Sequence, residues 1–255
     1  MDTKASRDNS FDIARALAFF AVIWGHLFPL HGMWFVYGFH LQVFYIAAGY
    51  FLHTDCPLGS FVAKKAKRLV VPYILVGAAI SLAMMIQEYL KGKEGFDAAS
   101  YLKEQLYYYY WEGTSPIGPM WFLPALFYAL VIVFLLAQKK YGLGLLPFIV
   151  VGGYLASTKI WLPFFLLHGV VASGYVGIGY CVARCKKPLE EKLSNKKEPL
   201  LLGVFMCAMV IWVIFQKTMT GMVYLYANDL PRGAIDYFGS LAAVYAIWYI
   251  SKKVL

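Results

Sequence analysis

The sequence has few charged side chains for its length. Only 15% of its 255 residues are charged, whereas 61% are hydrophobic, and the mean hydropathy is +0.61. A soluble domain cannot bury that much apolar side chain. A helical membrane protein can expose it, because lipid is the solvent and a helix satisfies its own backbone there. The apolar runs are long and continuous rather than alternating, which argues against a β-barrel. The composition therefore predicts an all-α protein, a polytopic bundle of transmembrane helices.

Cysteine is also scarce, and its spacing excludes most cysteine-based sites. The four cysteines, Cys56, Cys181, Cys185 and Cys207, form no CxxC pair and no even disulfide framework. Two of them share a helix face, which is more typical of packing than of metal binding, so we predict no metal. No repeat, low-complexity tract or small-residue cleavage site is evident. We expect the first apolar segment to be retained and residues 1–255 to form a single domain.

Hydropathy windows of about 20 residues mark about eight spans. They cover residues 11–30, 34–52, 69–90, 119–138, 143–158, 160–183, 199–217 and 234–251. With the N-terminus inside, sixteen of the 23 Lys and Arg residues fall on inner segments, six on outer loops and one within a span. This asymmetry predicts a multi-pass protein of the plasma membrane with both termini in the cytoplasm. It also accounts for the net charge of +9 without a nucleic-acid partner.

The first predicted span carries Arg15 and His26 on one face. Eleven helical residues turn ~20° past three full turns and rise ~16 Å, and the stretch between the two side chains is uncharged. Ionisable groups in a membrane are candidates for function, and a neutral imidazole suits general-base work. A helix-packing role for His26 is an equal alternative. Asp12 lies one turn before Arg15 and could hold its guanidinium, or form a simple salt bridge at the membrane surface.

The other polar candidates are less specific. His40, in the second span, is a second candidate for the same cavity, although a structural role is more typical of His31, His40, His53 and His168 alike. Lys65 and Arg68 lie one turn apart in an inner loop before the third span and could bind one phosphate. Their simpler interpretation is a topology signal that also attracts anionic lipid.

The outer segment 91–118 is rich in tyrosine. An aromatic belt at the membrane surface explains most of this composition, and a carbohydrate-stacking surface is the alternative.

Taken together, these motifs resemble those of the acyltransferase 3 family of integral-membrane acyltransferases, and most closely its fucose 4-O-acetylase-like branch. The matching residues are Asp12, Arg15 and His26 in the first span, the aromatic run 39–51 in the second, Lys65, Arg68, Pro72 and Tyr73 in the basic loop, and the helix start at 119–126. The chain departs from the family pattern at Ala48, Lys65 and Pro119. The family's final helix motif is missing as well, so we expect a short or C-terminally truncated member.

The resemblance implies transfer of an acyl group, expected to be acetyl from acetyl-CoA, to a hydroxyl of a sugar or cell-envelope glycan. It implies acyl-CoA as a donor substrate and no bound cofactor. The resemblance implies that His26 is the base and that Arg15, held by Asp12, binds donor phosphate or orients the site. It implies Lys65 and Arg68 as ligands of the CoA phosphates, and Trp121 and His40 as cavity residues. Two other classes stay open: a transporter or flippase of a small polar solute, and a non-catalytic membrane module with the same fold.

Overall fold

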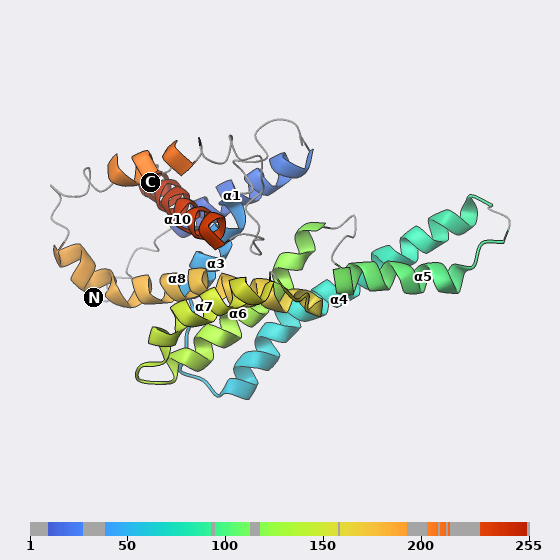
Figure 1. Cartoon of the computed structure of the whole chain (residues 1–255), viewed down its shortest axis with the longest axis horizontal. Helices are drawn as coiled ribbons and strands as arrows, with labels where there is room; N and C mark the ends of the chain where they lie inside the picture. The colour runs from blue at the N-terminus through green and yellow to red at the C-terminus, as the bar shows by residue number, and fades with distance from the viewer. Residues whose placement is uncertain are drawn as a thin grey trace, which may run out of the picture. The chain divides into compact units, whose positions relative to one another are not determined.

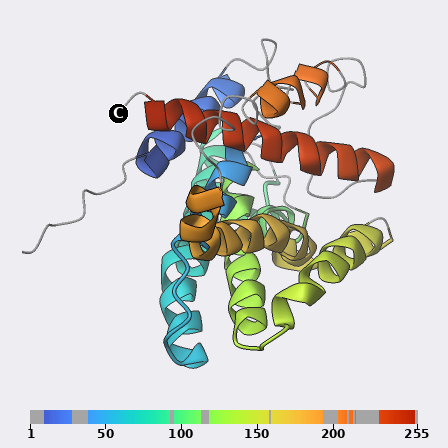
Figure 2. The same ribbon diagram turned by 90° about the vertical axis from the view of Figure 1, so that its left-hand side faces the viewer.

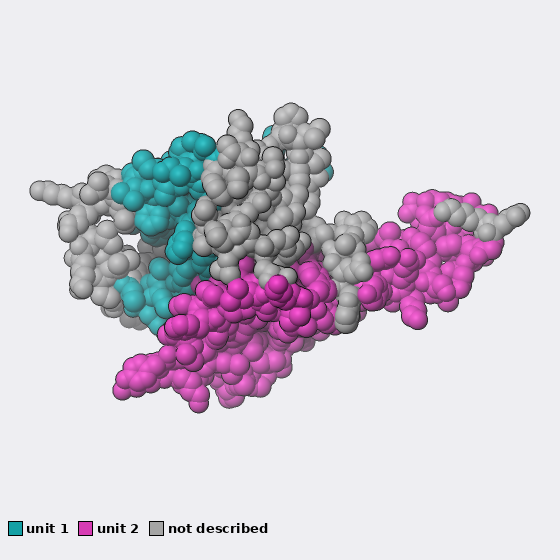
Figure 3. Space-filling model, viewed as in Figure 1, with its two compact units in different colours: residues 1–52, 175–255 teal, residues 53–174 magenta. Residues whose placement is uncertain are grey.

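The computed structural model describes residues 10–27, 39–92, 95–112, 118–157, 159–192, 203–208, 210–212, 214 and 230–253. These parts of the chain contain helices and no strand, which confirms the all-α prediction (Figure 1). They fall into two compact units (Figure 3). Unit 1 comprises residues 1–52 and 175–255, and unit 2 comprises residues 53–174. The prediction of a single domain stays a prediction.

Two helices in the described part are long and apolar enough to cross a membrane, Leu58–Leu90 and Pro163–Cys185. Shorter apolar helices cover Phe122–Ala137 and Gly142–Ser157. The presence of these helices supports the prediction of a membrane protein. The count of about eight spans is not confirmed, and the multi-pass topology stays a prediction.

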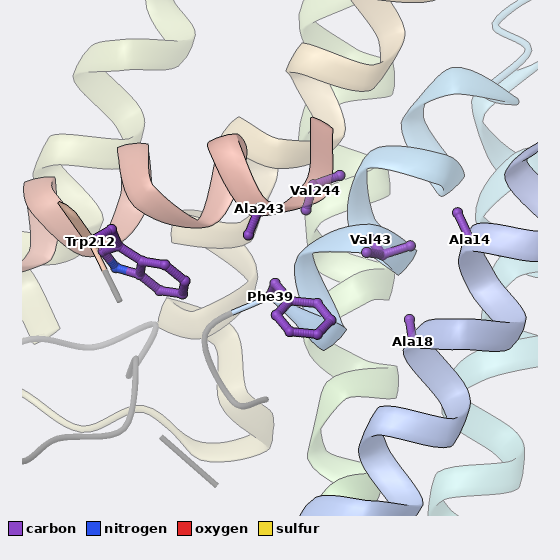
Figure 4. Packing of buried hydrophobic residues seen from close by; sticks show 7 residues of the cluster. All are labelled: Ala14, Ala18, Phe39, Val43, Trp212, Ala243 and Val244. Atoms are coloured by element: carbon purple, nitrogen blue, oxygen red, sulfur yellow. The ribbon is translucent and has the colours of Figure 1, made fainter. Parts of the chain in front are cut away.

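Unit 1 contains α1 (Ser10–Leu27), α3 (His40–Tyr50), α10 (Leu230–Lys253) and the later part of α8 (Leu166–Lys192). Figures 1 and 2 show α10, in red, running past α1, in blue. The core of unit 1 is a cluster of buried hydrophobic side chains from α1, α3 and α10 and from residues 39 and 212 (Figure 4). The cluster consists of Ala14, Ala18, Phe39, Val43, Trp212, Ala243 and Val244. The alanines on α1 allow the neighbouring helices to approach closely.

Helices α3 and α8 touch through their backbones. A Cβ placed on Gly49 would lie 1.9 Å from the carbonyl oxygen of Val176, and one on Gly179 would lie 2.0 Å from that of Ile46. No other residue type fits at either position without a shift of one helix. Glycine here serves close packing, as it commonly does between transmembrane helices.

Unit 2 contains α4 (Leu58–Leu90), α5 (Ala98–Tyr107), α6 (Phe122–Ala137), α7 (Leu146–Ser157) and the first part of α8. Short helices η1 (Tyr108–Glu112), η2 (Gly118–Trp121), η3 (Gly142–Leu145) and η4 (Pro163–Phe165) join them. At the start of α4, Phe61 stacks on Phe134 near the end of α6, with ring centroids 4.2 Å apart. Near the other end of α6, Tyr73 and Trp121 both contact Phe165. The first half of α4 is therefore antiparallel to α6.

The structure corrects two predicted loops. The basic segment before the third span is not a loop, because α4 begins at Leu58, well before the predicted span start at residue 69. Pro72 lies inside this helix rather than at its entry. The outer segment 91–118 is largely helical, and α5 and η1 return along α4. The apolar pattern stops at the charged residues of both segments, but α4 and α5 include some of those residues.

Candidate functional site

The ion pair predicted on α1 is present. Arg15 donates from Nη2 to Asp12 Oδ1 at 2.6 Å and from Nε to the Phe11 carbonyl at 3.2 Å. Its guanidinium carbon also lies 5.5 Å from the centroid of the Phe51 ring, within cation–π range. A carboxylate, a carbonyl and a ring thus fix the orientation of a half-buried guanidinium. Such a group is positioned to bind an anion or a polarised oxygen.

Arg15 lies at the edge of the packed face of α1. Phe11, Ala14 and Ala18 are buried on that face, whereas Phe19 is 56% exposed. On a helical wheel, Arg15 is ~40° from Phe11, on the side toward Phe19. The side chain is therefore held by unit 1 without being enclosed by it.

His26 belongs to α1, one residue before its end. Its side chain lies outside the described residues, so its predicted pairing with Arg15 in one cavity stays a prediction. The backbone from residue 15 to residue 26 is helical, as the prediction of a shared helix face required.

His40 is the first residue of α3 and is 3% exposed. At the other end of α3, the Tyr50 ring lies 4.3 Å from that of Phe11 at the start of α1. The two helices are therefore antiparallel, which places His40 toward the end of α1 that carries His26. Both predicted imidazoles belong to the same end of this helix pair.

Lys65 and Arg68 lie on one helix, three residues apart, as a shared phosphate site requires. They follow the start of α4 by ~10 Å and ~15 Å along its axis. Lys65 is half-buried, with Nζ 5.5 Å from the Phe61 centroid, and Arg68 is exposed. Because Phe61 stacks on Phe134, both cations lie level with the apolar helix α6. Both cations therefore lie on the part of α4 that runs beside α6.

The predicted residues separate into two sets. Asp12, Arg15, His26 and His40 belong to unit 1, and Lys65, Arg68 and Trp121 belong to unit 2.

Trp121 lies against the imidazole of His168, for which the sequence predicted a structural role. His168 is 5% exposed, and its ring centroid lies 5.2 Å from that of Trp121, 5.5 Å from Trp161 and 5.3 Å from Phe165. These contacts fit the structural role predicted for His168. They also make Trp121 part of a closely packed aromatic cluster in unit 2. The aromatic residues just before His168 in the sequence were the available signal for this cluster.

The chain enters α8 through an unusual backbone conformation. Phe164 and Phe165 have φ values of 55° and 57°, in the left-handed region that bulky residues rarely adopt. Pro163 precedes them, and the aromatic contacts of Phe165 hold its side chain in place. Strain of this kind persists only where the surrounding packing fixes it.

In the parts of the chain that the structure describes, no three His, Cys, Asp or Glu side chains gather as metal ligands would. The four cysteines are free and exposed. The candidate residues that the structure describes are the Asp12–Arg15 ion pair, the cations of α4, His40 and the aromatic ring of Trp121.

The comparisons with known proteins identify the family. A family model described as an acyltransferase domain matches residues 8–253. No curated protein and no solved structure matches the chain. The match extends to the end of α10, past the motifs that suggested the family, and the more specific fucose 4-O-acetylase-like branch stays a prediction. Because the match covers nearly all of its length, the chain belongs to the acyltransferase 3 family of membrane acyltransferases.

Proposed function

We propose that this protein is an integral-membrane O-acyltransferase. It moves an acyl group, acetyl in the simplest case, from acyl-CoA to a hydroxyl of a sugar or cell-envelope glycan. The observation that carries the proposal is the Asp12–Arg15 ion pair, on the same helix as His26, in a chain of this family. Asp12 holds the Arg15 guanidinium in place, and residues 16–25, between Arg15 and His26, carry no charge.

In the proposed reaction, His26 accepts the proton of the acceptor hydroxyl. The hydroxyl oxygen attacks the thioester carbonyl, the carbon–sulfur bond breaks, and the CoA thiolate leaves and is protonated. The products are an ester and free CoA. A positioned general base contributes about 10²–10⁴-fold to such a rate, and imidazole has a pKa suited to the task.

Arg15 has a different role in this proposal. Its guanidinium is always protonated and presents a planar fork of donors, so it suits a phosphate of the donor. Asp12 holds that fork in one orientation. Lys65 and Arg68 bind the CoA phosphates. His40 is a candidate cavity residue of unit 1, and Trp121 is one of unit 2.

We further propose that α4 begins on the cytoplasmic side, with both chain termini in the cytoplasm. The distribution of Lys and Arg supports this orientation. It brings the basic part of α4 to the side where acyl-CoA is available.

Thioester consumption tests the proposed function. The purified protein in nanodiscs is incubated with acetyl-CoA and an envelope glycan fraction, and free thiol and glycan mass are followed. We expect CoA release together with a mass gain of one acetyl group on the glycan. A His53→Ala variant serves as a control, because His53 is exposed and outside the proposed site. A folded protein that releases no CoA and modifies no glycan would indicate a transporter or a non-catalytic module.

A further inference from the structure

The second half of α4 and α5 form a two-helix hairpin, here called the arm, comprising residues 73–90 and 98–107. Figure 1 shows α5 beside α4 in this part of unit 2. The base of the arm is fixed by tyrosines. Tyr109 donates to the Tyr73 carbonyl at 3.2 Å, Tyr73 donates to the Tyr109 carbonyl at 3.1 Å, and their rings stack at 4.8 Å. The arm is thus a defined structural element.

One face of the α4 part is covered by the returning chain. Tyr73, Gly77 and Ser81 are buried, and a Cβ on Gly77 would meet the Tyr109 ring at 2.1 Å. These positions recur every four residues, so they lie on one side of the helix. The returning chain follows that side.

The opposite face of α4 is apolar and uncovered. Leu75, Leu82 and Ile86 lie ~140–180° around the helix from Gly77, and they are 63%, 45% and 46% exposed. Leu90 continues the row at 76% exposed. No charged residue occurs between Arg68 and Glu88. A soluble surface rarely exposes such a continuous apolar row.

The side of α5 that faces away from α4 is polar. Ser100, Lys103 and Glu104 are exposed, whereas Leu102 and Leu106 are half-buried. Asp97 caps the start of α5 by accepting from the backbone N–H groups of Ala99 and Ser100. The arm therefore has an apolar side formed by α4 and a charged side formed by α5.

We propose that the arm lies in the interface of the membrane, with the Leu75–Leu90 face in lipid and α5 toward water, a placement that differs from the transmembrane span predicted for residues 69–90. Immersion of the whole arm in hydrocarbon would bury Lys103 and Glu104, at a cost of several kcal/mol each. Full projection into water would expose the apolar row. A two-sided element at the interface satisfies both, as amphipathic helices do.

Three further features favour lipid as the occupant. The apolar row is continuous with Val71, which is exposed on the part of α4 before the arm. Pro72 removes one helix hydrogen bond just before the arm, which permits α4 to bend from the bundle toward the membrane plane. The tyrosines at the base of the arm are residues that prefer the interface.

Collision accessibility of spin labels tests this placement. The four native cysteines are replaced by serine, and one label is introduced by Leu82→Cys, Ile86→Cys, Lys103→Cys or Glu104→Cys. Each full-length protein is placed in phosphatidylcholine–phosphatidylglycerol nanodiscs. Oxygen, which concentrates in lipid, and a water-soluble nickel chelate report the two environments. Thermal stability identifies any variant that fails to fold, and labels at the neighbouring positions Ala83 and Ala99 replace it.

We expect the labels at 82 and 86 to favour oxygen and to lose collisions with the nickel chelate, and those at 103 and 104 to show the reverse. Equal nickel accessibility at all four sites would overturn the proposal in favour of an arm in water. Oxygen preference at all four would overturn it in favour of a fully inserted hairpin. Dipolar broadening between labels at 86 that disappears on dilution with unlabelled protein would show that a second copy covers the face, and would overturn it too.

Discussion

At the scale of single residues, the best-defined feature is the Arg15 guanidinium. Asp12 and the Phe11 carbonyl hold it in one orientation at the edge of the packed face of α1. This local arrangement was predictable from the sequence, because side chains three residues apart on a helix meet. The contact between His168 and Trp121 was not predictable, since the two residues are distant in the sequence and meet only through folding.

Arg15→Lys should reduce acyl transfer while leaving the fold intact. A lysine keeps the charge but cannot reproduce the forked donor geometry. We expect kcat/KM to fall by about 10–100-fold, because a hydrogen bond to a charged group is worth roughly 1.5–3 kcal/mol. Steady-state kinetics with acetyl-CoA check the value, with thermal stability as the control. Activity equal to that of the wild type would assign Arg15 to topology or packing only.

Gly49→Ala should destabilise unit 1. The added methyl group would lie 1.9 Å from the Val176 carbonyl oxygen, so α3 and α8 must separate. We expect a loss of about 1–3 kcal/mol, as for other overpacked sites. Gly152→Ala is the matched control, because that helical glycine has nothing within 4 Å of an added Cβ. The control should gain up to about 1 kcal/mol from helix propensity. Equal thermal stability of the two variants would contradict the close contact.

At the scale of helices, α4 shows what hydropathy can and cannot predict. Hydropathy located the apolar part of the helix at 69–90, but not its start at Leu58. Lysine and arginine are good helix formers, so a basic segment can continue a helix while ending an apolar run. The return of α5 along α4 depends on contacts between Tyr73 and Tyr109, which are distant in sequence and carry no periodic signal.

Replacement of both Lys65 and Arg68 with Gln should weaken donor binding selectively. We expect the KM for acyl-CoA to rise about tenfold or more, since two charge-assisted contacts to phosphate are lost. The KM for the acceptor should stay near that of the wild type. The matched control is replacement of Lys139 and Lys140 with Gln, because both are exposed and lie in a turn. An equal effect of the two double variants would reduce the basic part of α4 to a topology signal.

Tyr109→Phe should loosen the base of the arm. The loss of one buried hydrogen bond to the Tyr73 carbonyl should cost about 0.5–1.5 kcal/mol. Burial, and then the neighbouring Tyr110, raise the pKa of Tyr109 from 10.0 to about 12. A raised pKa means that folding favours the protonated phenol. Its contribution is therefore complete below pH 10 and is lost as the pH rises toward about 12.

Thermal unfolding measured between pH 8 and about 12 checks both statements. The wild type should lose stability over the upper part of this range more than Tyr109→Phe does. Tyr107→Phe is the control, since Tyr107 is 50% exposed. Parallel curves for the wild type and Tyr109→Phe would show that the phenol does not titrate differently on folding.

At the scale of the whole molecule, composition and motif order were the informative signals. The low charge predicted a helical membrane protein, and four loosely matching motifs in order predicted the family, which the match over residues 8–253 confirms. The division into two units could not be predicted, because it depends on which helices pack together. For the same reason, the sequence separated neither the His26 set from the Lys65 set nor the arm from the bundle.

The central claim is that His26 acts as the base of an acyl transfer. The most direct test is single-turnover acyl transfer by His26→Ala in nanodiscs, with the donor and acceptor both saturating. We predict a rate about 10²–10⁴-fold below that of the wild type, with unchanged thermal stability and donor affinity. A His40→Ala variant measured alongside identifies any base that replaces it. A wild-type rate in a well-folded His26→Ala protein would contradict the account and remove His26 from the mechanism.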